Sequence, residues 1–174
     1  MAKRKVEVVP YNKEWIEKFQ AEKELISRDF SPYKINLYHI GSTSVPELCA
    51  KPVIDILAET ENLNYFDLKT HLFEKSGYIA KGENGIAGRR YFFKCDEKGN
   101  RLIHLHGFEK GNPEIKRHLV FRNYLRQFPD EARRYGEVKE KAAAKFPWDI
   151  DSYIEFKNGI VKELEKKAMF WAKK

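Results

Sequence analysis

The residues best suited to chemistry lie in one stretch, residues 39–59, with the sequence HIGSTSVPELCAKPVIDILAE. Its turn combines Gly41 with the hydroxyl groups of Ser42, Thr43 and Ser44. Glycine lets backbone N–H groups approach a ligand closely, and hydroxyls add donors beside them, so this turn is suited to phosphate. Asp55 follows within an apolar run, where an ionised carboxylate is costly unless a metal, a cation or several donors compensate it. The stretch therefore predicts a phosphate-binding turn beside an acid that can hold a metal ion.

Two histidines further along the chain add possible metal ligands. His104 and His106 alternate with Ile103 and Leu105, so both imidazoles are expected on one side of an extended strand. With Asp55 they make a set of two histidines and a carboxylate, which suits zinc, manganese or iron better than magnesium, because magnesium prefers oxygen ligands. The alternative is that the histidines are fixed polar residues that hydrogen-bond Asp55 or the backbone.

Basic residues near these motifs are candidates to bind phosphate. Lys51 lies between the turn and Asp55, and Arg90 is preferred among the cations because a guanidinium holds phosphate oxygens in a bidentate fork. Because successive side chains of a strand point to opposite faces, Arg89 is then expected to point away from the phosphate. His118 and Arg122 lie four residues apart on a predicted helix and can project together toward the sheet. Simple docking of that helix through paired polar groups explains them equally well.

The elements that must position these residues follow from turn and cap signals. A helix is expected from Asn12 to about residue 29, strands at 35–40 and 53–57, and a second helix from about residue 62 to Gly77. A hairpin is expected at 90–107, and three helices follow from Asn112, separated near Pro129 and Pro147. This order predicts an α+β fold with a helical C-terminal part. At 174 residues we expect a single domain, residues 1–174, with a sheet-bearing core at about 1–110 and C-terminal helices at about 112–172.

Charge and hydropathy limit the function classes. The formal net charge is +7, of which residues 111–174 hold +5, from 15 Lys/Arg against 10 Asp/Glu. This balance favours anionic partners, but the chain lacks the mixed aromatic and basic motifs of RNA modules, so nucleic-acid binding ranks last. No apolar run approaches a membrane span, and Val6-Glu7-Val8 near the start alternates instead of forming an apolar signal core. A cytoplasmic location is expected.

Longer strings of residues resemble known families. The pairing of Gly41-Ser42 with Asp55 on the next strand resembles the nucleotidyltransferase superfamily, in which a Gly-Ser turn precedes an acid-x-acid strand. A more specific likeness, to the GrpB family of small bacterial proteins, is carried by HIGSTSVPELCAKPVIDI, GRRYFF, HLH and RHLVFRNYLR, with VVPYNKEW near the start. This resemblance implies a nucleotidyltransferase-like mixed β-sheet flanked by helices. The family is assigned that fold without an established reaction.

The resemblance implies an enzyme that uses a divalent metal, magnesium or manganese with zinc as a further choice, to transfer a nucleotidyl group from a nucleoside triphosphate to an unidentified acceptor. Asp55 would be catalytic and would hold the metal with His104 and His106. The chain departs from the pattern at Leu57, where the second acid belongs, and Glu59 lies about 7 Å further along the strand. A non-catalytic protein that binds a nucleotide or a coenzyme A-related ligand through a degenerate site is therefore the alternative.

Overall fold

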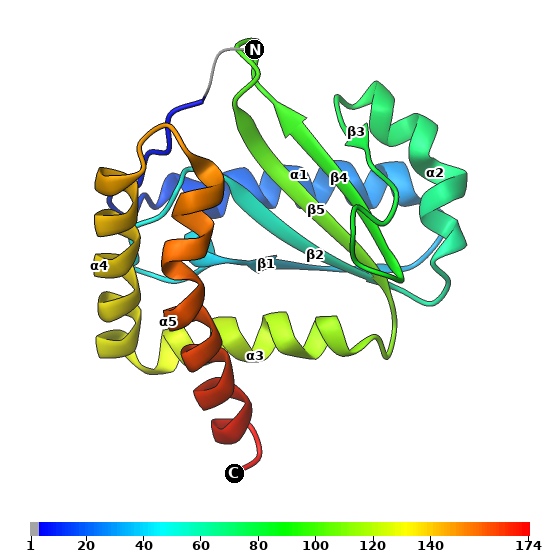
Figure 1. Cartoon of the computed structure of the whole chain (residues 1–174). Coiled ribbons are helices and arrows are strands. Elements are labelled where there is room, and N and C mark those ends of the chain that lie inside the picture. The colour runs from blue at the N-terminus through cyan, green and yellow to red at the C-terminus, as the bar shows by residue number, and fades with distance from the viewer. Residues whose placement is uncertain (1–3) are drawn as a thin grey trace.

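The fold is built on a five-stranded sheet in the order β1-β2-β5-β4-β3, in a computed structural model that describes residues 4–174 (Figure 1). β2 and β5 pair in parallel and the other neighbouring strands pair antiparallel, so the sheet is mixed. The strands are β1 (Ile35–Ile40), β2 (Ile54–Thr60), β3 (Ile79–Ala80), β4 (Arg89–Cys95) and β5 (Arg101–Glu109). Together with the flanking helices, they confirm the predicted α+β fold.

One face of the sheet is covered by α1 (Glu14–Phe30) and α2 (Asn64–Lys75). In Figure 1, α1 runs behind the strands and α2 stands beside β3. A side-chain oxygen precedes the start of each helix: Asn12 accepts a hydrogen bond from the backbone N–H of Glu14, and Asn62 from that of Asn64. The apolar stripes of both helices pack against alternate residues of the strands in the main core, which includes Trp15, Phe30, Phe66, Phe73, Ile56, Phe92 and Leu105. Each large side chain buried there contributes about 1.5–3 kcal/mol to folding.

The opposite face is covered only in part, by α3 (Pro113–Gln127). Asn112 accepts a hydrogen bond from the Glu114 N–H, and Pro113 occupies the first turn, as the cap signal predicted. Ile115 packs with Leu57 and other residues of the central strands in a separate apolar cluster. Asp55, His104 and His106 lie beside this cluster and are half-buried.

The last two helices, α4 (Pro129–Lys145) and α5 (Ile150–Trp171), pack against α3 and against the chain that follows β1. Val45 and Leu48 from that chain lie in the same apolar cluster as Leu164 of α5. Figure 1 shows α4 and α5 together at one side of the sheet, with α2 at the other. The C-terminal helices therefore reach the turn that follows β1.

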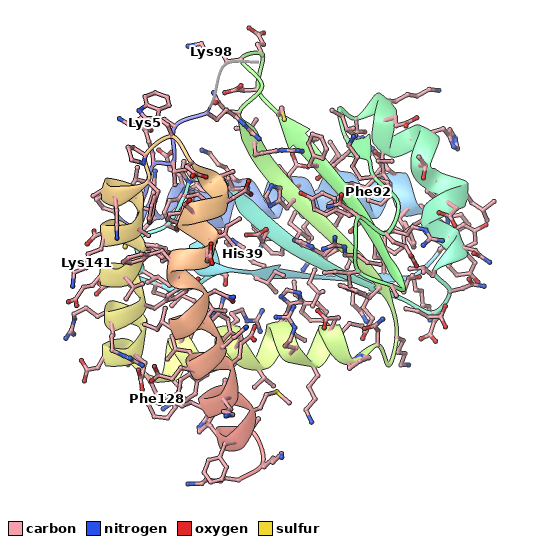
Figure 2. The ribbon with its side chains drawn as sticks, viewed as in Figure 1. Lys5, His39, Phe92, Lys98, Phe128 and Lys141 are labelled. Carbon is pink, nitrogen blue, oxygen red and sulfur yellow. The ribbon has the colours of Figure 1, made fainter. Side chains whose placement is uncertain are left out.

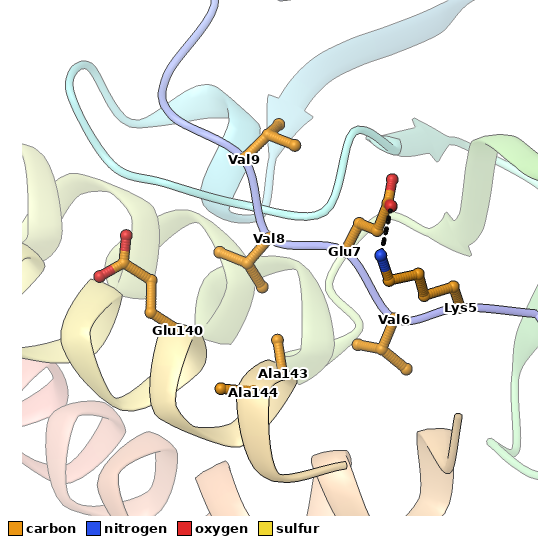
Figure 3. A pocket seen from close by; sticks show the side chains of 8 residues that line it. All are labelled: Lys5, Val6, Glu7, Val8, Val9, Glu140, Ala143 and Ala144. Atoms are coloured by element: carbon orange, nitrogen blue, oxygen red, sulfur yellow. Dashed lines mark ion pairs between the residues drawn. The ribbon is translucent and has the colours of Figure 1, made fainter. Parts of the chain in front are cut away.

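The N-terminal arm lies along α4 and borders a shallow pocket of about 400 Å³ (Figure 3). The pocket is lined by residues 5–9 and by Glu140, Ala143 and Ala144, and it contains none of the predicted site residues. Within residues 4–174, no helix combines the length and the apolar character needed to cross a membrane.

Candidate active site

Asp55 is the centre of the candidate site because the register of the parallel strands places two histidines beside it. Asp55 pairs with His104 and Leu57 with His106 across β2 and β5. The Asp55 Oδ1 atom lies 3.1 Å from His104 Nδ1 and 3.3 Å from His106 Nε2. One ligand atom from each residue falls within 4.8 Å of the other two. The structure thus brings together the three residues predicted as metal ligands.

The Asp55 carboxylate is held in its ionised form. Burial alone would raise the pKa of Asp55, but the hydrogen bonds from His104 and His106, with the charges those rings can carry, hold it well below its usual range. The carboxylate is therefore available as an anionic ligand at any pH near neutrality.

Gly41 brings the turn after β1 into contact with the other oxygen of this carboxylate. Its φ is +72°, and a Cβ atom at this position would lie 2.7 Å from Asp55 Oδ2. Both the backbone conformation and the close approach therefore require glycine. The turn continues as a short 3-10 helix, η1 (Ser42–Ser44), in which the Ser44 hydroxyl donates to the Gly41 carbonyl. Arg126 of α3 fixes it by two hydrogen bonds to the Ser44 carbonyl oxygen, of 2.9 and 2.8 Å.

Two of the predicted phosphate-binding groups are thereby engaged within the protein. The Ser44 side chain is buried and its hydroxyl donates inside the turn. Arg122 donates from Nη1 to the carbonyl oxygen of His39, 3.1 Å away, and its remaining nitrogens donate to Asn123. His39 itself is buried, stacks on Phe19 and hydrogen-bonds Thr43. These contacts fasten α3 and η1 to the end of β1.

Arg90, predicted to bind phosphate beside the turn, lies on the other face of the sheet. Arg90 lies opposite Gly107 on the face covered by α2, where its guanidinium forms an ion pair with Asp67 at 2.7 Å. The residues of β4 that share the histidine face are Arg89 and Tyr91, since Tyr91 pairs with His106. Strand alternation was predicted correctly, but the face that each set occupies was reversed.

The Arg89 side chain is buried beside the histidines. Its Nε and Nη2 atoms donate to the carbonyl oxygens of Glu83 and Asn84, and its cation lies 4.9 Å from the Tyr91 ring. Its Nη1 atom is 3.5 Å from His106 Nδ1. A guanidinium can only donate, so Nδ1 accepts and the proton of the neutral imidazole is on Nε2, facing Asp55. Arg89 therefore selects one tautomer of His106.

The donor set fits a metal ion in its distances. Two ligand atoms bound to one tetrahedral zinc at about 2.1 Å lie about 3.4 Å apart, and the separations from Asp55 Oδ1 are 3.1 and 3.3 Å. A metal on His106 Nε2 would move the imidazole proton to Nδ1, where Arg89 also presents a proton. Metal-bound histidines ordinarily donate that second proton to a carboxylate or carbonyl. The two separations from Asp55 are compatible with a shared metal ion, and the Arg89 guanidinium is a donor that would oppose a proton on His106 Nδ1.

Lysines on the other side of Asp55 complete the surroundings of the turn. Lys51, one of the predicted phosphate ligands, is half-buried, and its Nζ atom lies 5.4 Å from the centre of the Tyr153 ring. Lys139 of α4 and Lys157 of α5 were not identified from the sequence. A signal was present for Lys139, which falls on the buried stripe of α4 formed by Ala132, Tyr135, Gly136 and Ala142. A lysine on such a stripe has no simple role as a solvated surface charge.

Comparisons with known proteins cover nearly the whole chain. A family model described as GrpB protein matches residues 5–167. The UPF0157 protein YqkA of Bacillus subtilis is 46% identical over 171 residues, which are 98% of this chain and 49% of the relative. The chain thus spans about half the length of that relative. The crystal structure of the conserved protein GrpB from Enterococcus faecalis matches with a TM-score of 0.92 and 39% identity, over 97% of this chain and 100% of that one.

A more distant likeness concerns the fold alone. The structure of Cid1, a nucleotidyltransferase, in complex with its short product ApU matches with a TM-score of 0.53 and 14% identity. The match covers 76% of this chain and 42% of that chain. It confirms the nucleotidyltransferase-like fold predicted from the Gly-Ser turn and Asp55.

Proposed function

The chain belongs to the GrpB family and has a nucleotidyltransferase-like fold, and from this premise we propose that it is a metal-dependent nucleotidyltransferase. It transfers a nucleotidyl group from a nucleoside triphosphate to a hydroxyl or amine of an acceptor. The observation that carries the proposal is the position of Asp55, with one carboxylate oxygen against the Gly41 turn and the other shared by two imidazoles.

Each residue of the site has a role in this proposal. Asp55, His104 and His106 hold a divalent metal, which supplies positive charge to the triphosphate when bound. The backbone at Gly41, the Ser42 hydroxyl and Lys51 bind the phosphates. The acceptor oxygen or nitrogen forms a bond to the α-phosphorus and releases its proton to solvent, while the bond to the bridging oxygen breaks and pyrophosphate leaves.

One observation favours a second candidate, a non-catalytic protein that binds a nucleotide or a coenzyme A-related ligand. Leu57 stands where nucleotidyltransferases carry a second acid, and it is fully buried in the apolar cluster under α3. Glu59 does not replace it, because its carboxylate accepts a hydrogen bond from Asn36 on the outer strand. A single carboxylate ligand is a weak basis for the charge compensation that phosphoryl chemistry needs.

Calorimetric titration of each nucleoside triphosphate with magnesium, manganese or zinc, and with chelator, tests both candidates. Binding that requires the metal and is lost in Asp55→Asn supports the enzyme, and pyrophosphate release with a pool of small acceptors then tests transfer. Binding that is equal with chelator and in Asp55→Asn supports the second candidate instead. Asp151→Asn, at an exposed position in the first turn of α5, is the matched control. Absence of binding under every condition would remove both.

A further inference from the structure

Three lysines from distant parts of the chain gather around the segment that joins the Gly41 turn to β2. Lys51 precedes β2, Lys139 is on α4 and Lys157 is on α5. The ammonium groups of Lys51 and Lys157 lie 5.4 and 5.5 Å from the centre of the same Tyr153 ring. The charges of both lower the pKa of Lys139. These three residues are called the lysine cluster below.

No carboxylate of residues 4–174 forms an ion pair with any ammonium group of the lysine cluster, although Asp55 and Glu140 act on it at longer range. Lys139 is only 2% exposed, donates to the carbonyl oxygen of Cys49, and lies 4.6 Å from the centre of the Tyr135 ring. Burial, with the charges of Lys157 and Lys51, lowers the pKa of Lys139 to about 7. An arrangement of buried like charges is costly unless an anion compensates it.

The half-buried Lys94 gives the contrast. It lies under α1 and forms an ion pair of 2.8 Å with Glu22, and both side chains are largely shielded from solvent. Among residues 4–174, Lys51, Lys139 and Lys157 form no such ion pair.

The cluster adjoins the candidate active site. The charge of Asp55 raises the pKa of both Lys51 and Lys157, against the larger effect of burial, so the carboxylate lies within electrostatic range of both ammonium groups. Tyr135, whose ring contacts Lys139, hydrogen-bonds Ser42 in the turn. The cluster is therefore electrostatically coupled to Asp55.

We propose that Lys51, Lys139 and Lys157 form a polyphosphate-binding site that takes the β- and γ-phosphates of a nucleoside triphosphate. Lysine is a compact point charge suited to phosphate oxygens, and a bound anion would raise the pKa of Lys139 so that all three ammonium groups carry charge. This inference deepens the proposed function, since it assigns the substrate to the triphosphates and makes the C-terminal helices part of the site. It also implies that inorganic triphosphate binds without nucleoside or metal, and more tightly than phosphate.

Calorimetric titration of inorganic triphosphate, pyrophosphate and phosphate in the presence of chelator tests the inference. We expect wild type to bind triphosphate most tightly, and Lys139→Met and Lys157→Gln each to weaken it at least tenfold. Lys141→Met, on the same helix but pointing outward (Figure 2), is expected to bind as wild type does. Circular dichroism and thermal unfolding establish that the variants fold, and Lys157→Gln, at a half-buried position, provides a second route if Lys139→Met does not.

The outcomes separate this inference from the proposed function. No binding of inorganic triphosphate by wild type, or equal binding in all variants, would overturn the lysine site even if nucleotidyl transfer were found. Tight binding that Lys139→Met and Lys157→Gln abolish, in a protein that shows no transfer, would establish the lysine site and remove the enzyme. The titration contains no metal, nucleoside or acceptor, so it does not depend on Asp55 chemistry.

Discussion

The charged groups on the two sides of Asp55 are compensated in different ways. On the histidine side, His104 and His106 hydrogen-bond the carboxylate, and Arg89 is bound by backbone carbonyl oxygens. On the lysine side, the charged groups of Lys51 and Lys139 contact aromatic rings or a carbonyl oxygen, and within residues 4–174 no carboxylate forms an ion pair with them. The first side is held by hydrogen bonds within the protein, whereas the second gathers positive charge without an ion pair, which an anionic ligand would neutralise.

This difference indicates how a triphosphate would be divided between the two sides. A hydrogen-bonded set of fixed geometry can position reacting atoms without reorganisation. A cluster of unpaired cations contributes affinity mainly when an anion arrives, because each ammonium group then regains the favourable interactions it lost on burial. We therefore expect chemistry at the histidine side and substrate affinity at the lysine side, and each prediction below tests that division.

The largest effect is expected for Gly41→Ala, which disturbs both sides. The new methyl group would lie 2.7 Å from Asp55 Oδ2, and the positive φ adds about 1–2 kcal/mol of backbone strain. We expect urea unfolding to show a loss of about 2–3 kcal/mol, and calorimetry to show no metal-dependent nucleotide binding. Gly159→Ala in α5, where no atom lies within 4 Å of the added group, should leave binding unchanged. Nucleotide binding retained in Gly41→Ala would refute the close contact on which the division is based.

His106→Ala is expected to affect one side alone. Loss of one of three ligands should weaken zinc or manganese binding at least tenfold, as measured by competition with a chromogenic chelator. Inorganic triphosphate should bind this variant with unchanged affinity, because Lys139 and Lys157 are on the other side of Asp55. If metal affinity does not change, His106 is a fixed hydrogen-bond partner of Asp55, which is the alternative left open by the sequence.

The sequence predicted the histidine side better than the lysine side, for a physical reason. Asp55, His104 and His106 lie on strands, where alternation fixes which residues share a face and the pairing of β2 with β5 brings them into contact. Alternation does not indicate which face of the sheet packs against the helices. Arg90 was therefore predicted on the face that Arg89 occupies. Gly107, which pairs with Arg90, identifies the face that α2 covers, because Phe66 of α2 packs directly against this glycine.

The lysine side depends on helix packing instead. Lys51 was identified because it is close in sequence to Asp55, but Lys139 and Lys157 reach the site only through the way α4 and α5 pack on α3 and on the loop after β1. Helical periodicity predicts which stripe is buried but not what that stripe faces. Cap signals such as Asn12 and Asn112 gave the helix starts, since those depend on neighbouring residues alone.

The pH dependence of the free energy of unfolding tests whether the charge of the Lys139 ammonium group lacks a compensating anion in the free protein. Its pKa is about 7 when folded and about 10.4 when unfolded. Between these values the unfolded chain binds one more proton, so the Lys139 contribution to stability rises with pH, by up to about 1.4 kcal/mol per unit, and the penalty is complete below pH 7. The charged or titratable groups around it are Cys49, Lys51, Lys157 and Glu140.

The measurement is urea unfolding of wild type and Lys139→Met at pH 7, 8 and 9, where titration of the unfolded Cys49 thiol is common to both proteins and cancels in their difference. The stability of wild type relative to Lys139→Met should rise across this range, while the difference between wild type and Lys141→Met stays flat. A flat difference for Lys139→Met as well would mean that the ammonium group remains charged through pH 9. The lysine side would then be compensated in the free protein, and the comparison between the two sides would fail.

The smallest effect is expected for Arg89→Met, and it concerns the histidine side. Removing the donor that faces His106 Nδ1 lets the imidazole carry its proton there and present Nε2 to a metal. An opposed donor of this kind is worth about 1 kcal/mol, so zinc should bind about fivefold more tightly. Arg90→Met removes the same charge from the adjacent residue, but its guanidinium pairs with Asp67 on the other face, so its metal affinity should equal that of wild type. Weaker zinc binding in Arg89→Met would show instead that Arg89 positions His106 as a ligand, and the histidine side would then be a preformed metal site.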